Sequence, residues 1–206
     1  SPAIWEELEK VGVTSKEACG NTVRNVTASP FAGIDPEEPF DVSPYAQGVF
    51  EYFLRNPVCQ EMGRKIKIAF SSSRKDSAFT YIHDFGFIPK IKDGAYGFEV
   101  IVGGGLGAQA FIGQLAYEFL PQDELIPFIE AGLRVFDRYG ERERRHKARM
   151  KFLIDPKKGI GLDGFMKLIE EERKSLPYET YKIDTKKVVT TVPEEGSLLT
   201  VAEIDT

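Results

Sequence analysis

Apolar and polar positions alternate over residues 65–70, which read Lys-Ile-Lys-Ile-Ala-Phe. Successive side chains of a strand point to opposite faces, so Ile66, Ile68 and Phe70 should share one face, and Lys65 and Lys67 the other. The apolar face predicts packing against a core. The two ammonium groups, roughly 7 Å apart on the other face, repel each other unless an anion or water lies between them. The pattern therefore indicates a candidate anion site, with a strand whose lysines simply face solvent as the alternative.

The remaining pattern predicts one packed domain followed by a polar segment. Helical spacing recurs over residues 4–10, 43–56, 113–120, 123–139 and 165–173. Strand-like patterns cover residues 19–30, 85–92 and 96–102, and the Asp93-Gly94 pair between the last two is typical of a hairpin turn. We expect a domain over residues 1–175 and a C-terminal tail or interdomain linker over residues 176–206, with a few strand-like residues at 181–192.

The composition excludes some classes of function. A chain of 206 residues with 42% hydrophobic and 29% charged residues is long and apolar enough for a well-buried globular domain. The net charge of −5 argues against a general nucleic-acid binder, which needs a positive surface to displace counterions from phosphates. We find no apolar run that could span a bilayer and no leader segment, so we expect no membrane association and a cytoplasmic location.

Cysteine and histidine are too few for a metal cluster. Cys19 and Cys59 are the only cysteines, they lie far apart in the sequence, and the chain has two histidines. We therefore expect neither a disulfide scaffold nor a cluster held by soft ligands of this chain alone.

Basic residues dominate residues 141–151. Such a run is usually a solvated helix face, on which Glu141 and Glu143 could pair with Arg145 and Lys147 four residues later. Arg149 and Lys151 have no acidic partner at that spacing, so a functional basic patch that includes Lys147 remains an alternative.

Two further motifs suggest other chemistry. Residues 103–108 fit Gly-x-Gly-x-x-Ala, but the stretches that follow look helical rather than leading to the second parallel strand of a dinucleotide-binding unit. His83 next to Asp84 could orient a general base, although the sequence places no nucleophile beside them.

Several motifs together, in this order, are similar to those of assimilatory nitrite and sulfite reductases. They are GNTVRNVT at residues 20–27, GRKIKIAFS at 63–71, HDFGFI at 83–88, GFEVIVGGGLG at 97–107 and RMKFL at 149–153. Over about residues 19–173 the chain resembles the first sirohaem-binding domain of that family. The resemblance implies an α+β fold with a mixed, mostly antiparallel sheet and packed helices.

The resemblance also implies an activity and its residues. In the complete enzyme, sirohaem coupled to a 4Fe-4S cluster passes six electrons to nitrite or sulfite, and the donor is a ferredoxin or a flavoprotein. Residues at the positions of Arg24, Lys65 and Lys67 line the distal pocket, hold the anion and supply protons. Together with Asn25, Lys147 and Lys151, these three are also the expected cofactor contacts.

One departure from the family pattern is large. The Cys-x5-Cys and Cys-x3-Cys motifs that bind the cluster in the family are absent here. We therefore expect the isolated chain to be inactive and to need the cluster-binding remainder of the reductase as its partner. The alternative is a non-catalytic module that binds an anion or a tetrapyrrole. Nitrite and sulfite need the same positive pocket, so these residues do not distinguish them.

Overall fold

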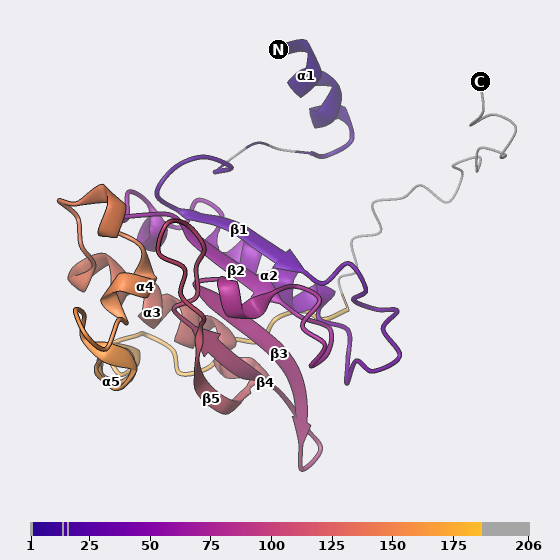
Figure 1. Cartoon of the computed structure of the whole chain (residues 1–206). Coiled ribbons are helices and arrows are strands. Elements are labelled where there is room, and N and C mark those ends of the chain that lie inside the picture. The colour runs from indigo at the N-terminus through magenta and orange to yellow at the C-terminus, as the bar shows by residue number, and fades with distance from the viewer. Residues whose placement is uncertain (1, 14, 16, 187–206) are drawn as a thin grey trace, which may run out of the picture.

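The computed structural model describes residues 2–13, 15 and 17–186, and Figure 1 shows their arrangement. The strands are β1 (Val23–Ala28), β2 (Ile66–Phe70), β3 (Phe85–Lys92), β4 (Ala95–Val102) and β5 (Gln114–Pro121). The α-helices are α1 (Pro2–Lys10), α2 (Ser43–Phe53), α3 (Leu125–Tyr139), α4 (Met150–Leu153) and α5 (Gly161–Arg173). Short 3-10 turns are η1 (Pro57–Cys59), η2 (Thr80–Ile82), η3 (Gln122–Glu124) and η4 (Arg145–Lys147).

The five strands form one mixed sheet in the order β1-β2-β3-β4-β5. β1 and β2 are parallel and are joined by a crossover that contains α2, and β2 and β3 are also parallel. β3 pairs antiparallel with β4 along its whole length, and β4 pairs antiparallel with β5. The predicted α+β class with a mixed sheet is confirmed. The two antiparallel strand pairs, β3 with β4 and β4 with β5, involve the longest strands of the sheet.

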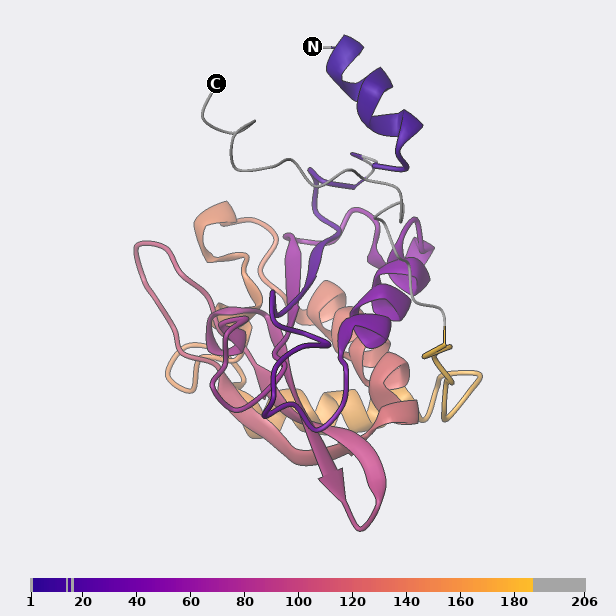
Figure 2. The ribbon, with the colours of Figure 1, turned by 90° about the vertical axis from the view of Figure 1, so that its right-hand side faces the viewer.

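The hydrophobic core lies between the sheet and a layer of helices. Figure 2 shows α2 and α3 on one side of the sheet, and the side chains of Ile66, Ile68 and Phe70 are fully buried beneath them. α3 contributes most of its residues to this core, because its apolar positions cover a broad face and its charged residues are confined to one stripe. The alternation of residues 65–70 therefore predicted the inward face of β2 correctly.

The opposite face of the sheet is covered in part by loops. Over β3 and β4 it is covered by η2 and by the chain around Gly113, where any side chain would clash with Ile101. Over β1 and β2, Asn25 pairs in register with Lys67, so both side chains belong to this face. The lysine face of β2 is thus separated from the helix layer by the sheet itself.

Two predicted elements were wrong. Residues 113–120 form most of a strand, β5, and not a helix. The basic run at residues 141–151 is not a helix either: it contains the 3-10 turn η4 and the start of α4, and Glu141 pairs with Arg144 three residues on.

The two ends of the described chain differ in how they contact the domain. α1 has no buried residue and lies apart from the sheet (Figure 1). Residues 181–186 form no strand, and residues 187–192 lie outside the described part. Ile183 nevertheless packs against Gly48 of α2, and the hydroxyl of Tyr178 donates to the carboxylate of Glu130. The division at residue 175 stays a prediction. None of the described helices is long and apolar enough to cross a membrane.

Candidate anion site

Five basic side chains gather at the β1 and β2 end of the loop-covered face. Arg64 and Lys65 precede β2, Lys67 lies in β2, Arg24 lies in β1 and Arg149 precedes α4. Each is half-buried, and Lys65 lies close enough to the other four to interact with them electrostatically. We call these five residues the cation cluster.

Arg24 lies at an irregularity of β1. The pairing with β2 shifts register between Val23 and Asn25, which releases Arg24 from strict alternation. Its Nε donates to the carbonyl oxygen of Ala18 at 2.8 Å. This bond fixes the stem of the guanidinium, and no described carboxylate forms an ion pair with it.

The positive side chains of the cation cluster repel one another. Burial lowers the pKa of Lys65, and the positive charges of Arg24 and Lys67 lower it further. The pKa of Arg64 is lowered in the same way, by burial and then by Arg145 and Arg149. Like charges held this close favour a bound anion, which would relieve the repulsion.

One side-chain nitrogen of Arg64 has no hydrogen-bond partner among residues 2–13, 15 and 17–186. Its Nε is shielded from solvent and makes no hydrogen bond within the described part of the chain. Leaving a buried donor unpaired costs free energy, more so on a charged group. An oxygen ligand at this place would satisfy it.

Asp84 is the carboxylate that lies within the cluster. It is fully buried and accepts from the backbone N–H of Lys67 at 2.9 Å. A guanidinium nitrogen of Arg149 lies 2.9 and 3.0 Å from its two oxygens. Burial raises the pKa of Asp84, and Arg149 opposes that shift. This carboxylate therefore fixes Arg149 against the start of β2.

Comparison with known proteins identifies the family. A family model described as "Nitrite and sulphite reductase 4Fe-4S domain" matches residues 19–176. The chain belongs to this reductase family.

The relatives are reductases of greater length. The chain is 36% identical over 172 residues to sulfite reductase (ferredoxin) 1 of Mycolicibacterium paratuberculosis, covering 83% of this chain and 30% of the relative. It is 32% identical over 175 residues to the chloroplastic ferredoxin–nitrite reductase of Oryza sativa, covering 82% and 29%. The structure of Mycobacterium tuberculosis NirA superposes with a TM-score of 0.74 and 31% identity, over 88% of this chain and 32% of that one. The chain thus spans about 30% of the length of these relatives.

Within this reductase domain, the structure brings together four of the six predicted site residues. Arg24, Asn25, Lys65 and Lys67 lie at one end of the loop-covered face. Lys147 lies in η4 and lines a separate hollow of about 950 Å³ beside Phe152.

Lys151 is buried against residues 103–112, and its role as a cofactor contact stays a prediction. Only 3% of the residue is exposed, and its ammonium group donates to the carbonyl oxygens of Gly105, Leu106 and Gln109. Burial lowers its pKa, and Arg149 adds to this. The ammonium group of Lys151 is therefore bound by backbone carbonyl oxygens of residues 103–112, which we call the glycine loop.

The two other motifs are explained by this geometry. The glycine loop joins the antiparallel strands β4 and β5, so it does not open the strand-helix-strand unit of a dinucleotide site. His83 Nδ1 lies 2.8 Å from the carbonyl oxygen of Phe79, while Asp84 binds Arg149. The adjacent pair is thus not arranged as a base and its orienting carboxylate.

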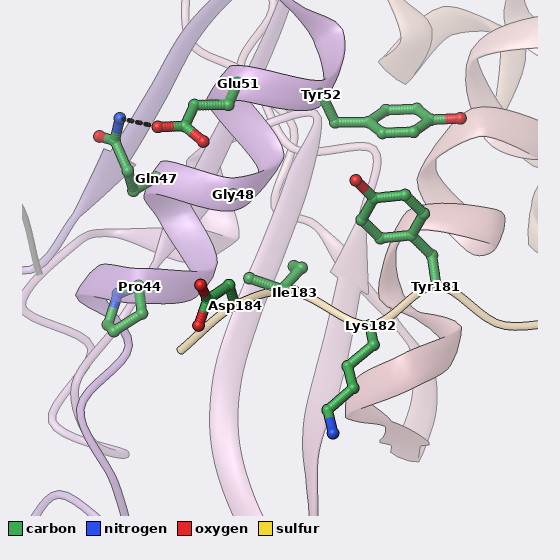
Figure 3. Close-up of a pocket in the computed structure, with 9 residues that line it drawn as sticks. All are labelled: Pro44, Gln47, Gly48, Glu51, Tyr52, Tyr181, Lys182, Ile183 and Asp184. Carbon is green, nitrogen blue, oxygen red and sulfur yellow. Dashed lines mark hydrogen bonds between the residues drawn. The ribbon is translucent and has the colours of Figure 1, made fainter. Parts of the chain in front are cut away.

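A further hollow lies on the helix side of the reductase domain. It has a volume of about 350 Å³ and is formed by α2 and residues 181–184 (Figure 3). Its charged residues are Glu51, Asp184 and Lys182, so carboxylates outnumber ammonium groups in its lining. This hollow is unsuited to an anion, and the sheet separates it from the cation cluster.

Sequence reasoning missed Arg64 and the pairing of Arg149 with Asp84. Arg64 precedes the first residue of β2, where the alternation of a strand no longer says which way a side chain points. The Arg-Lys-x-Lys spacing was the available signal. The partners Asp84 and Arg149 are 65 residues apart, and only the fold brings them together.

Among the described residues, no group of three or more His, Cys, Asp or Glu side chains could hold a metal ion. The family description names a 4Fe-4S domain. In this reductase domain, the described residues therefore do not provide the ligands for such a cluster.

Proposed function

We propose that this chain is the sirohaem-binding domain of a nitrite or sulfite reductase and contributes the cations that hold the anionic substrate. The observation that carries this proposal is the cation cluster, in which one buried carboxylate, Asp84, accompanies five basic side chains. The family membership and the reductase names of the relatives support the same conclusion.

The cluster fits a ligand rich in anionic oxygens. The unpaired Nε of Arg64 and the mutual repulsion around Lys65 are both satisfied by carboxylate or oxyanion oxygens. A tetrapyrrole with many carboxylates and a small oxyanion share this chemistry. Sirohaem, when bound, would supply the iron centre at which the anion is reduced.

The basic residues would bind the anion and deliver protons to it. Arginine suits a fixed grip on oxygen atoms, and Arg24 is held in place by its bond to Ala18. Lysine can deliver protons, and a lowered pKa makes Lys65 a better acid. Preorganised cations where negative charge accumulates are a large source of rate enhancement. We assign anion binding to Arg24, Lys65 and Lys67, and proton delivery to the two lysines.

The 4Fe-4S cluster does not fit the described residues, because no suitable group of ligands is present among them. A partner must therefore provide the cluster, and the chain alone should be inactive. The remainder of the reductase is the expected partner, since the relatives are about three times as long. A ferredoxin is the expected donor, as the names of the relatives indicate.

The test is the double substitution Lys65→Met and Lys67→Met in the complete reductase that carries this chain. Each preorganised donor is worth roughly 10²–10³ in rate, so reduction of nitrite or sulfite should fall by orders of magnitude. The control is Lys167→Met, which removes an exposed lysine of α5 on the far side of the sheet. Near-normal turnover in the double variant, with sirohaem bound, would refute the assigned role.

A non-catalytic binding module is the second candidate, favoured by the lack of a cluster-ligand group among the described residues. Sequencing the native reading frame on both sides of this chain distinguishes the two. A continuation with Cys-x5-Cys and Cys-x3-Cys supports the reductase. If neither the same frame nor a co-purifying partner provides such motifs, the binding module replaces it.

A further inference from the structure

We infer that the glycine loop at residues 103–112 is itself part of the anion site, through backbone N–H groups that the buried Lys151 orients. The ligand would be an anionic oxygen, from a carboxylate or a small oxyanion. This inference rests on the proposed function, because it extends the same site from the cation cluster onto the loop. In it, Lys151 is a positioning residue and not a direct contact.

Lys151 has no hydrogen-bonding capacity left for a ligand. An ammonium group has three donors, and its nitrogen lies 3.3, 3.1 and 2.5 Å from the carbonyl oxygens of Gly105, Leu106 and Gln109. It also lies 5.5 and 5.2 Å from the ring centres of Phe111 and Phe152, which shield it from solvent. The buried charge therefore holds the loop by its backbone, from the inner side.

The inward carbonyls determine where the amides point. In a trans peptide the C=O and the N–H point in opposite directions, and no peptide bond in the described chain is cis. The carbonyls of Gly105, Leu106 and Gln109 share their peptides with the N–H groups of residues 106, 107 and 110. Those three N–H groups must therefore point away from Lys151, toward the outside of the loop.

These outward amides have no hydrogen-bond partner among the described residues. The N–H groups of Leu106, Gly107 and Ala110 donate to no described residue, whereas those of Gly105 and Phe111 close the base of the loop against each other. Residues 106 and 107 are successive, and successive free N–H groups in a glycine-rich turn form a concave site for anions. The positive charge of Lys151 lies behind them and strengthens their polarity.

The loop borders the cation cluster. A side chain at Gly105 would lie 3.3 Å from a guanidinium nitrogen of Arg149, which is a member of the cluster. Gly105 therefore lets the loop backbone approach Arg149 closely. One ligand with several anionic oxygens could bind the cluster and the loop amides together, and a single small oxyanion could bind either part.

The experiment is an NMR titration of the ¹⁵N-labelled full chain with two probes, sodium nitrite and uroporphyrin I, a porphyrin octacarboxylate. We expect the amide signals of Leu106, Gly107 and Ala110 to shift with the same saturation curve as those of Asn25 and Lys67. A shift with nitrite assigns the loop to the small oxyanion. A shift with the porphyrin alone assigns it to the carboxylates of the tetrapyrrole.

Substitution of Lys151 tests the positioning role. In Lys151→Met the loop signals should no longer respond, and the dissociation constant should rise about tenfold from the loss of oriented donors, while Asn25 and Lys67 still respond. Lys151→Arg, which keeps the charge, should restore part of the loop response. Lys167→Met is the control on the far side of the sheet and should titrate like the unmodified chain.

The outcomes separate this inference from the proposed function. If Asn25 and Lys67 respond but the loop amides of the unmodified chain do not, the loop is not part of the site and the inference fails alone. If neither region responds to either probe, both proposals fail. If Lys151→Met does not fold, the titration of the unmodified chain still decides whether the loop binds, and Lys151→Arg decides the positioning role. If the loop response is unchanged in a folded Lys151→Met, Lys151 does not orient the amides.

Discussion

At the scale of single residues, Asp84 determines the arrangement of the cation cluster. It is the carboxylate that fixes Arg149, and it also accepts the N–H of Lys67 at the start of β2. The negative charge of Asp84 offsets the positive charge of Arg149, although Arg149 still contributes to the lowered pKa of Arg64 and Lys65. In the function proposed above, the other cations of the cluster are the ones that bind the anion.

We predict that Asp84→Asn destabilises the domain by about 3 kcal/mol, because removing one partner leaves the other charge of a buried ion pair uncompensated. The measurement is the free energy of unfolding from urea denaturation. Asp163→Asn, at an exposed position of α5, is the control and should change it little. An unchanged unfolding free energy for Asp84→Asn would show that the ion pair does not hold this region together.

The placement of some candidate site residues was predictable at this scale, and that of others was not. Lys65 and Lys67 followed from alternation, which is a local property of the backbone. The contacts of Lys151 did not, because its acceptors are carbonyl oxygens, and every residue type carries one. A lysine that binds backbone atoms leaves no pattern in the sequence that would distinguish it from one that binds a carboxylate.

At the scale of elements, Glu130 of α3 joins three parts of the fold. Its buried carboxylate accepts from the hydroxyls of Tyr52 in α2 and Tyr178 in the C-terminal segment, and from Arg134. Burial raises the pKa of Glu130, but these hydrogen bonds outweigh it and hold the pKa below its ordinary value of 4.5. The carboxylate thus fastens residues after α5 to the helix layer.

We predict a corresponding loss of stability in acid. A carboxyl group whose pKa is lowered by folding stabilises the protein above its unfolded pKa, and this contribution is lost as the pH falls through the folded value. The free energy of unfolding should therefore decrease below about pH 4.5, and Glu130→Gln should flatten that decrease. Urea unfolding across pH 3–7, with the exposed Glu171→Gln as control, measures it. An equal slope in Glu130→Gln would contradict the assignment.

The wrong prediction for β5 has a physical cause at the same scale. Its apolar residues include Leu115, Ala116, Phe119 and Leu120, a spacing that favours a helix. In the structure the pairing of β4 with β5 changes register between Phe98 and Val100 and again after Val100. Each such irregularity shifts which residues face the core, so the strand shows no regular alternation.

At the scale of the whole molecule, the chain is a packed domain with an N-terminal helix that contributes no core. α1 buries nothing, while the segment after α5 packs Tyr178 and Ile183 against the helix layer. The family resemblance predicted a mixed sheet with packed helices, but the sequence pattern did not identify β1, β2 and β3 as the parallel strands, since pairing between distant strands depends on contacts that periodicity does not encode.

We predict that shortening the chain affects the melting temperature at the C-terminal end but not at the N-terminal end. Removal of residues 1–13 should leave the melting temperature unchanged within about 1 °C, because surface changes without buried contacts have little effect. Removal of residues 177–206 should lower it by several degrees, because Tyr178 and Ile183 lose their contacts. Calorimetry of the two shortened chains measures both. A large shift on N-terminal removal, or none on C-terminal removal, would contradict this description of the domain.

The position of α1 also determines which part of the protein tryptophan fluorescence can report on. Trp5 is the only tryptophan of the chain, it lies on α1, and half of it is exposed. Its fluorescence should therefore be red-shifted and open to quenching by iodide already in the folded state, and should change little as the sheet and its helix layer unfold. An optical unfolding curve recorded at tryptophan wavelengths would describe α1, and the cooperative melting of the domain has to be followed through circular dichroism.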